Sequence, residues 1–538
     1  MVLRRRVILA VSTSLAVLGP IAAAWSSSGG NPLPGWAAAL PGHCTAAVAH
    51  HGDAQQVSAL NGPVACGTTT GWPAVENRIE VTNDNAVIYE PALQGGPVLA
   101  GSGHVPGWGH GWSVARTFDN GQKWDAPSVS VYPDDYVLEG QVDNNIYVDH
   151  ETNRFFWYQY NSLGTPQIPY GCGGGGGATV VYSDNDGNTW SWGFDRDHDC
   201  SENPTILTGA VPVKGEPTSS YKNVVYLCGD NYSTGIAATA NPGFSCSKSL
   251  SGGATWLGTT LDAPVTSAPS PLGAARQGFY SGPGKDNSID PGNPAYPQCD
   301  GASSSAGAGV QPLPDGTLVV LMTCNANTFV SESTDEGATW NVVGGKLPNG
   351  TGSLRIDRAG NLYLLQKVTD ANGDKLLLSH LTAGAAQWSA PVNMVAPGVQ
   401  TIGTSFFVQG TYAPTLKPGH IAVAYYAIKR GSSTGYSDGF ITATADALAP
   451  NPLFWSGQVN DPQHPLLYNT QTSGNIGVTV LDFNGGAWSP NGRSVWGSFV
   501  QDCGANLLQD PSCTSRYPGT NPGNPDDGFA GRLVWPNS

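Results

Sequence analysis

The sequence predicts an all-β protein that folds as a β-propeller of about seven four-stranded blades, with six blades as the alternative. Three observations support this fold class. The 538-residue chain contains 71 glycines and 41 prolines, and only 12% of its residues are charged. A turn of one pattern recurs along the chain. Runs typical of short strands align around that turn in units of four, for example 145–150, 154–161, 178–184 and 189–194. Such sequences favour short strands joined by tight turns over helices.

The first 24 residues have the features of a secretory signal peptide. Arginines at 4–6 precede an apolar run at 7–18, and alanines at 22–24 supply small residues for cleavage. The run is too short to span a bilayer comfortably, so we expect a secreted, extracellular chain with no transmembrane anchor after cleavage. Residues 25–75 are expected to form a flexible lead and a small disulfide-stapled cap. Residues 76–538 form the expected propeller, in which the N-terminal run 78–83 adds the closing outer strand to the last blade.

The recurring turn has the pattern Ser/Thr-x-Asp-x-Gly-x-Thr-Trp. Copies stand at 117–124, 183–190, 249–256 and 333–340, and the third has Ser251 in place of the Asp. We expect the Asp or Asn side chain to bond to the turn backbone, the Gly to adopt positive φ, and the Trp to pack under the next blade. These positions are interpreted as structural: Asp119, Asn185, Asp335, Trp124, Trp190, Trp256 and Trp340.

This pattern resembles the Asp-box, or BNR, repeat of sialidases and other propeller glycosidases. The resemblance covers residues 76 to 536 and implies a sialidase-like propeller in which these turns lie away from the active site. It does not include the arginine motif that holds the sialidase substrate, because Tyr89 stands where the first arginine would be. Residues 94–117, where the family's acid/base Asp would lie, contain no Asp or Glu. The sequence therefore disfavours true exo-sialidase activity.

Ten cysteines follow the signal peptide, and an even number behind an export signal predicts disulfide bonds. None forms a Cys-x-x-Cys pair, which disfavours a zinc site or a thioredoxin-like redox site. We expect neighbours in the sequence to pair: Cys44 with Cys66, Cys172 with Cys200, Cys228 with Cys246, Cys299 with Cys324, and Cys503 with Cys513.

The formal net charge is −16, and no basic run follows the first six residues. An acidic surface repels phosphate backbones, so we expect no nucleic-acid partner. The partner we expect is an extracellular glycan or protein, bound by a monomer.

Propeller topology assigns the long insertions to one face. The recurring turns connect strands three and four, whereas the long insertions connect strands two and three or successive blades, and these two sets lie on opposite faces. Loops gathered on one rim are where binding or catalysis is usually built. The insertions are 102–112, 161–177, 229–243, 262–306 and 502–527.

Ligand-binding candidates occur in two of these insertions. His104, Trp108, His110 and Trp112 share one loop, where indoles could stack on sugar rings and histidines could bind a metal or shuttle a proton. The alternative is a loop packed by its own aromatics. In the 262–306 insertion, Arg276 and Tyr280 are candidates. Arg276 could clamp a carboxylate or form an ordinary surface salt bridge.

Catalytic candidates are carboxylates in the loops that lead into blades. Asp134, Asp135 and Glu139 precede the second blade, and Glu202 precedes the third. Glycosidic cleavage usually needs one protonated and one ionised carboxyl group, although solvated loop charges explain the same residues. The run 195–199 spaces three carboxylates like part of a calcium loop, but lacks the later Gly and Glu. Calcium is kept open, the residues of any metal site stay unassigned, and no other cofactor is expected.

These patterns predict a secreted propeller that binds a glycan or protein ligand through its long-loop face. The alternative is a glycoside hydrolase that acts on a non-sialylated polysaccharide. The sequence leaves open whether the chain is an enzyme.

Overall fold

The fold comes from a computed structural model. It describes residues 33, 35–55, 62–74, 77–90, 112–125, 128–129, 145–160, 178–195, 201–209, 220–231, 243–256, 278–280, 303–304, 311–313, 315–324, 327–334, 341–347, 352–371, 373–402, 407–408, 417–432, 436–467, 483–502 and 526–536. The expected signal peptide at 1–24 lies outside this part of the chain. No helix within the described ranges is long and apolar enough to cross a membrane.

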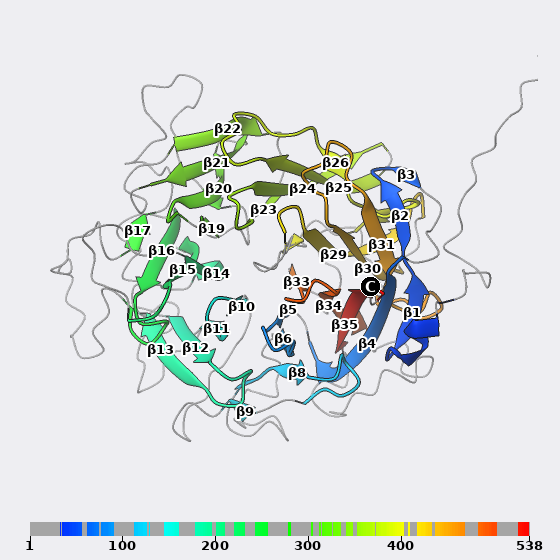
Figure 1. Cartoon of the computed structure of the whole chain (residues 1–538), viewed down its shortest axis with the longest axis horizontal. Helices are drawn as coiled ribbons and strands as arrows, with labels where there is room; N and C mark the ends of the chain where they lie inside the picture. Colours follow the sequence, from blue (N-terminus) through cyan, green and yellow to red (C-terminus); the bar gives the residue numbers. More distant parts are fainter. Residues whose placement is uncertain are drawn as a thin grey trace, which may run out of the picture.

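Seven small antiparallel sheets form a ring, so the predicted seven-bladed β-propeller is confirmed (Figure 1). The strands of each blade are given from the axis outward. Blade 1 contains β5 (Arg78–Val81), β6 (Val87–Glu90) and β8 (Ala115–Thr117), and blade 2 contains β10 (Asn145–Asp149), β11 (Arg154–Tyr160), β12 (Ala178–Ser183) and β13 (Ser191–Asp195). Blade 3 contains β14 (Ser201–Gly209), β15 (Val224–Asn231), β16 (Gly243–Ser249) and β17 (Gly278–Tyr280). The short strands β7 (Trp112–Ser113) and β9 (Ser128–Val129) pair with each other next to blade 1.

Blades 4 and 5 continue the same order. Blade 4 contains β18 (Ser303–Ser304) and β19 (Gln311–Pro312), both paired with β20 (Leu318–Cys324), followed by β21 (Asn327–Ser333) and β22 (Asn341–Leu347). Blade 5 contains β23 (Gly352–Ile356), β24 (Leu362–Asp370), β25 (Gly373–Leu381) and β26 (Val392–Asn393). Blade 6 contains β27 (Val399–Thr401), β29 (Ile421–Lys429), β30 (Asp438–Thr444) and β31 (Phe454–Gln458). Blade 7 contains β33 (Gly486–Trp488), β34 (Ser494–Asp502) and β35 (Asp526–Val534). A parallel pair, β28 (Phe407–Val408) with β32 (Phe483–Asn484), precedes β29 and β33 respectively.

An N-terminal strand closes the ring, as expected, but it is not the run at 78–83. The closing strand is β4 (Val64–Pro73), which pairs antiparallel with β35. Residues 78–81 instead form β5, the inner strand of blade 1, because a tight turn at 82–86 pairs them with β6. Ile79 and Val81 of β5 then pack into the apolar seam that blade 1 shares with blade 7.

The chain before β4 also pairs with outer strands, those of blades 6 and 7. The 3₁₀-helix η1 (Gly35–Ala39) leads to β1 (His43–Ala46), which pairs with β4, and the expected Cys44–Cys66 disulfide links these two strands. Next, β2 (Val48–His51) pairs with β31 of blade 6 and with β3 (Ala54–Gln55). The described strands within residues 25–75 thus extend blades 6 and 7. Cys228 is also disulfide-bonded, and its register partner across β15 and β16 is Cys246; the bonds of the other expected pairs lie outside the described side chains.

Apolar seams between neighbouring blades hold the ring together. Trp190 packs against Phe155 and Trp157 of its own sheet, in a cluster that also contains Ile88 of blade 1. Trp256 of blade 3 lies in the cluster shared with blade 2. The tryptophans of the three described turns, Trp124 included, therefore pack toward the preceding blade and not under the next one, because each of these turns places its Trp on the side of the sheet that faces the preceding blade.

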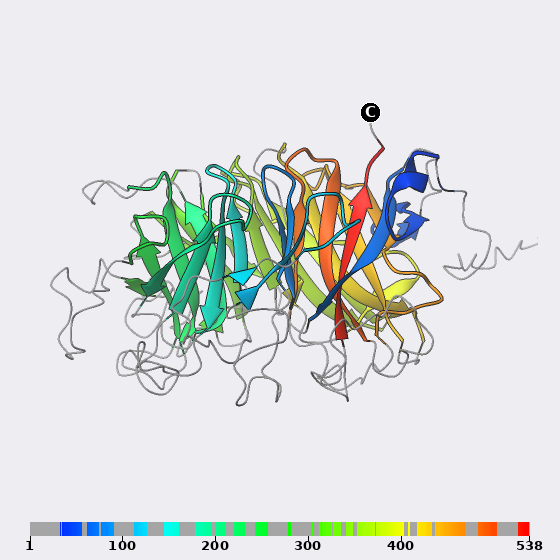
Figure 2. The same ribbon diagram turned by 90° about the horizontal axis from the view of Figure 1, so that it is seen from below.

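Strand alternation gives the ring two different faces. We call the side that carries the turns 118–124, 184–190 and 250–256 the box-turn face; the connections between first and second strands lie there too (Figure 2, upper side). We call the other side the opposite rim. The described ends of β6, β11 and β15 reach the opposite rim, where the sequence continues into residues 91–111, 161–177 and 232–242.

Candidate functional site

The three described box turns use their polar side chains internally. In each, the first hydroxyl accepts the amide of the glycine four residues later at 2.9 Å; the pairs are Thr117 with Gly121, Ser183 with Gly187, and Ser249 with Gly253. The third residue accepts a second amide at 2.7–2.8 Å; these pairs are Asp119 with Lys123, Asn185 with Thr189, and Ser251 with Thr255. Ser251 therefore reaches the same amide as the Asp of the pattern. These groups are occupied in shaping the turn; the Asp335 to Trp340 turn lies outside the described residues.

Each box turn also receives an arginine from the preceding blade. In these three turns the acceptor is the carbonyl of the residue before the recurring glycine, and the Nη1–O distance is 2.8 Å in all three cases. The pairs are Arg532 with Asn120, Arg116 with Asp186, and Arg154 with Gly252. The first of these spans the closing seam between blades 7 and 1. The same contact therefore joins internal seams and the closing seam.

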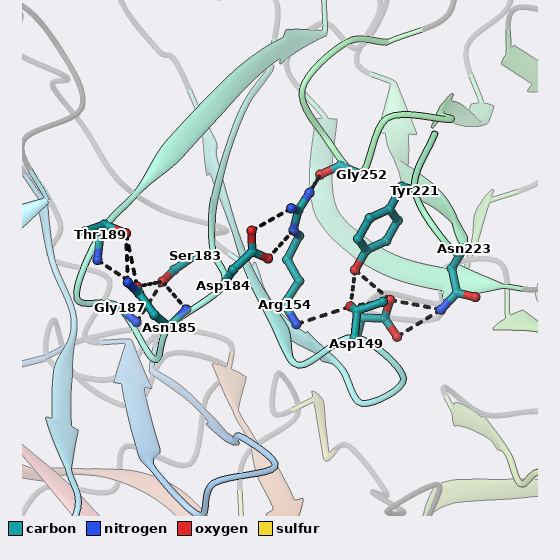
Figure 3. Close-up of polar contacts among 11 residues, drawn as sticks. Asp149, Arg154, Ser183, Asp184, Asn185, Gly187, Thr189, Tyr221, Asn223 and Gly252 are labelled. Carbon is teal, nitrogen blue, oxygen red and sulfur yellow. Dashed lines mark hydrogen bonds and ion pairs between the residues drawn. The ribbon is translucent and has the colours of Figure 1, made fainter. Parts of the chain in front are cut away.

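The arginine between blades 2 and 3 belongs to a larger network (Figure 3). Arg154 makes a bidentate pair with Asp184 at 2.6 and 2.7 Å. Its guanidinium carbon also lies 4.3 Å and 4.6 Å from the ring centres of Tyr182 and Tyr221. Tyr221 Oη in turn donates to the buried carboxylate of Asp149 at 2.8 Å. This arrangement rigidifies the seam and leaves no free carboxylate for chemistry.

A second buried carboxylate has the same role in blade 5. Asp149 ends β10, and Asp357 follows β23, both where an inner strand reaches the box-turn face. Asn223 donates to Asp149 at 2.9 and 3.0 Å, and Asn361 donates to Asp357 at 2.9 and 3.1 Å. Tyr363 Oη donates to Asp357 at 2.6 Å. A buried carboxylate that is fully hydrogen-bonded stabilises the fold, so we interpret Asp149 and Asp357 as structural residues.

One acidic side chain near the axis differs from these. Glu80 lies on β5, is partly buried, and has buried Ile79 and Val81 on either side. Desolvation raises its pKa to about 8, against the opposing effects of Arg355, its own strand's Val81 amide and Arg78. Arg355 belongs to β23 of blade 5, which is not adjacent to blade 1, so their interaction crosses the axis. A carboxyl group that keeps its proton at neutral pH is the kind used as a general acid. The sequence interpretation missed it because residues 78–83 were expected to form an outer strand.

Turns from several blades meet at the box-turn end of the axis. Asn83 of blade 1 bonds to His150 of blade 2 twice, each time at 2.8 Å. Glu151 of blade 2 pairs with Lys222 of blade 3 at 3.2 Å and with Arg358 of blade 5 at 3.6 Å. Burial lowers the pKa of His150 to about 4, with Asp149 opposing and Arg358 adding to the decrease. Neutral His150 therefore persists at physiological pH.

Most of the sequence candidates lie outside the described residues: His104, Trp108, His110, Asp134, Asp135, Glu139 and Arg276. For three others the structure gives the backbone position alone. Glu202 is the second residue of β14, an inner strand, and pairs with Asp230 at the opposite-rim end. Trp112 lies in β7, and Tyr280 ends the outer strand β17. Within the described ranges, no group of three or more His, Cys, Asp or Glu side chains could hold a metal ion.

The sialidase arginine position is occupied by a structural tyrosine. Tyr89 is fully buried, donates to the carbonyl of Phe499 at 2.7 Å and accepts a bond from Asn77 at 2.8 Å. Its hydroxyl helps to hold blade 1 against blade 7. A neutral, buried phenol cannot replace a guanidinium that clamps a substrate carboxylate.

No family model matches the chain, and no curated protein matches its sequence. Solved structures with a similar fold include a protein of unknown function from Dyadobacter fermentans, at 11% identity and TM-score 0.36, over 88% of this chain and 98% of the other. A GH74 enzyme from Niastella koreensis is similar at 12% identity and TM-score 0.40, over 80% of this chain and 52% of the other. A sialidase from Streptococcus pneumoniae is similar at 11% identity and TM-score 0.36, over 86% and 68%. The propeller fold that the sequence pattern predicts is shown by the sheets of this chain itself.

Proposed function

We propose that this chain is a secreted propeller that binds an extracellular glycan through its opposite rim. The observation that carries the proposal is the contrast between the two faces. On the box-turn face, the polar groups of three turns are held by their own backbones and by arginines of the preceding blades. Such a face is built for stability, so recognition falls to the other face.

The residues that the sequence pattern assigns to the opposite rim suit a sugar. The loop before β7 contains Trp108 and leads into Trp112, and the same loop holds His104 and His110. Indole faces stack on the apolar faces of sugar rings, while imidazoles bond to hydroxyl groups. A net charge of −16 disfavours polyanionic partners and is compatible with a neutral glycan.

The test is a glycan array followed by titration of the full chain with the glycans it retains. Trp108→Ala should weaken binding about tenfold or more, which is the usual loss for an aromatic anchor. The matched control is Phe118→Ala, since Phe118 is 55% exposed and lies on the box-turn face. Equal losses in both variants, or a loss in Phe118→Ala alone, would refute the assignment of the face. If the chain binds proteins but no glycan, the proposed ligand class, a glycan, is refuted.

The second candidate function is hydrolysis of a non-sialylated polysaccharide, and Glu80 is the observation that favours it. A proton held to about pH 8 next to the axis matches the acid half of a glycosidase pair. Glu202 lies at the opposite-rim end of its inner strand, whereas Glu80 lies toward the box-turn end, so Glu202 is not proposed as the other half. Reducing-sugar release from neutral polysaccharides should fall 10²-fold or more in Glu80→Gln if Glu80 is the acid. Absence of release by the wild-type chain rejects hydrolysis and leaves the binding proposal intact.

A further inference from the structure

The inner strands run from the opposite rim to the box-turn face, so each residue's place in its strand gives its depth along the axis. Glu80 is the third of four residues in β5, and Arg355 is the fourth of five in β23. Both lie toward the box-turn end. Each is partly exposed, whereas the residues on either side, Leu354 and Ile356 in the case of Arg355, are buried. Both are therefore partly exposed polar residues on inner strands, and Arg355 also donates from Nη1 to the carbonyl of Leu354 at 2.6 Å.

The turns that follow these strands are tied together just beyond that depth. Glu151 is the central residue, because its carboxylate pairs with Lys222 on one side and with Arg358 across the axis. Two blades lie between blades 2 and 5 on one side of the ring and three on the other, so the contact between Glu151 and Arg358 crosses the ring and is not part of a seam. The bonds between Asn83 and His150 bring the turn of blade 1 into the same group.

We propose that the axis of the propeller is a one-ended ligand site, closed at the box-turn face by the Glu151–Arg358 contact, with Glu80 and Arg355 as its innermost polar pair. This inference rests on the proposed function for its ligand, a glycan. It adds that the glycan enters from the opposite rim by a chain end and cannot thread through the ring. The guanidinium of Arg355 and the carboxyl group of Glu80 then bond to oxygens of the end unit.

The closure is tested without any ligand. Cysteines introduced as Glu151→Cys and Arg358→Cys should be joined by a short bis-maleimide, read as a cross-linked peptide by mass spectrometry with the native disulfides intact. The control pair is Glu151→Cys with Arg493→Cys, because Arg493 is exposed in the corresponding turn of blade 7, on the same face. Cross-linking of the first pair alone supports the closure. Failure of the first pair to cross-link, or equal reaction of both pairs, overturns it.

The ligand half uses a glycan retained on the array. Binding should survive the cross-link, whereas Arg355→Gln should weaken it about tenfold, the size expected for one charge-assisted hydrogen bond. Loss of binding on cross-linking, or unchanged affinity in Arg355→Gln with an unchanged melting temperature, overturns the one-ended site. If the wild-type chain binds no glycan, the proposed function fails, and the closure stands or falls on the cross-link alone.

Discussion

Arg116 donates from Nη1 to the carbonyl oxygen of Asp186 at 2.8 Å, across 70 residues of sequence and from blade 1 to blade 2. The same guanidinium pairs with Asp125 at 2.8 and 3.1 Å. One side chain therefore fixes the outer part of its own blade and orients the box turn of the next. Arg154 and Arg532 make the equivalent interblade contact, so the ring is joined by a repeated polar contact in addition to its apolar seams.

Replacement of Arg116 should therefore destabilise the ring. Arg116→Ala leaves the Asp186 carbonyl and Asp125 without their donor, and we expect a loss of about 1–3 kcal/mol. Arg116→Lys keeps the charge but not the two-sided geometry and should lose nearly as much. Denaturant unfolding measures both variants, with the exposed Arg493→Ala as the control. Stability equal to the wild type in Arg116→Lys would show that charge alone is sufficient.

The sequence pattern predicts the box turns and the blade count well, because both depend on local hydrogen bonds and strand spacing. It does not distinguish β4 from β5 as the closing strand, since either short run could pair with β35, and the choice depends on contacts distant in sequence. The buried carboxylates of Asp149 and Asp357 are missed for the same reason: Tyr221 and Asn223, which bond to Asp149, come from another blade. Glu80 is recognised only when β5 is placed next to the axis.

The degenerate third box turn allows a test of what its serine does. Ser251 Oγ accepts the Thr255 amide at 2.7 Å, as Asp119 accepts that of Lys123. Ser251→Ala removes this acceptor and should lower stability by about 1 kcal/mol. Ser251→Asp restores the pattern and should be neutral or slightly stabilising. Thermal unfolding of the two variants together separates the hydrogen bond from general effects of substitution at the turn; equal losses would contradict this account.

His50 predicts a loss of stability in acid. It is fully buried and bonded to Ser456 at 2.7 Å and to the Gly52 carbonyl at 2.8 Å. Burial lowers its pKa to about 4 from the ordinary 6.5. The folded chain thus favours neutral His50, and this contribution is complete above pH 6.5 and is lost as the pH falls toward 4. Melting temperature between pH 7 and pH 4 should fall less steeply in His50→Gln than in the wild type; parallel curves would contradict the assignment. His150, whose pKa is also lowered to about 4, contributes to the fall in melting temperature in both proteins.

Glu80 predicts the opposite behaviour in alkali. Because its pKa is raised to about 8, the folded chain favours the protonated acid, whereas the unfolded chain releases that proton near pH 4.5. The contribution is complete below pH 4.5 and is lost as the pH rises to about 8. Glu80→Gln has a similar shape and no charge, so it should be more stable than the wild type at pH 9 and nearly equal at pH 4.5. Unfolding at the two pH values measures the difference, and an equal shift at both would assign it to packing.

Gly252 is the position where the interblade contact itself demands a glycine. Its φ is +68°, and a Cβ atom there would lie 2.4 Å from Arg154 Nη1 and 2.7 Å from the Tyr221 ring. Gly431 is the matched control, because its φ is +74° and nothing lies within 4 Å of the Cβ position. Gly431→Ala carries the backbone strain alone, about 1–2 kcal/mol. Gly252→Ala must in addition displace Arg154 from its place between Tyr182 and Tyr221, so we expect a loss larger by at least about 2 kcal/mol. Equal losses in the two variants would mean that Arg154 moves freely and that the contact between blades 2 and 3 contributes little.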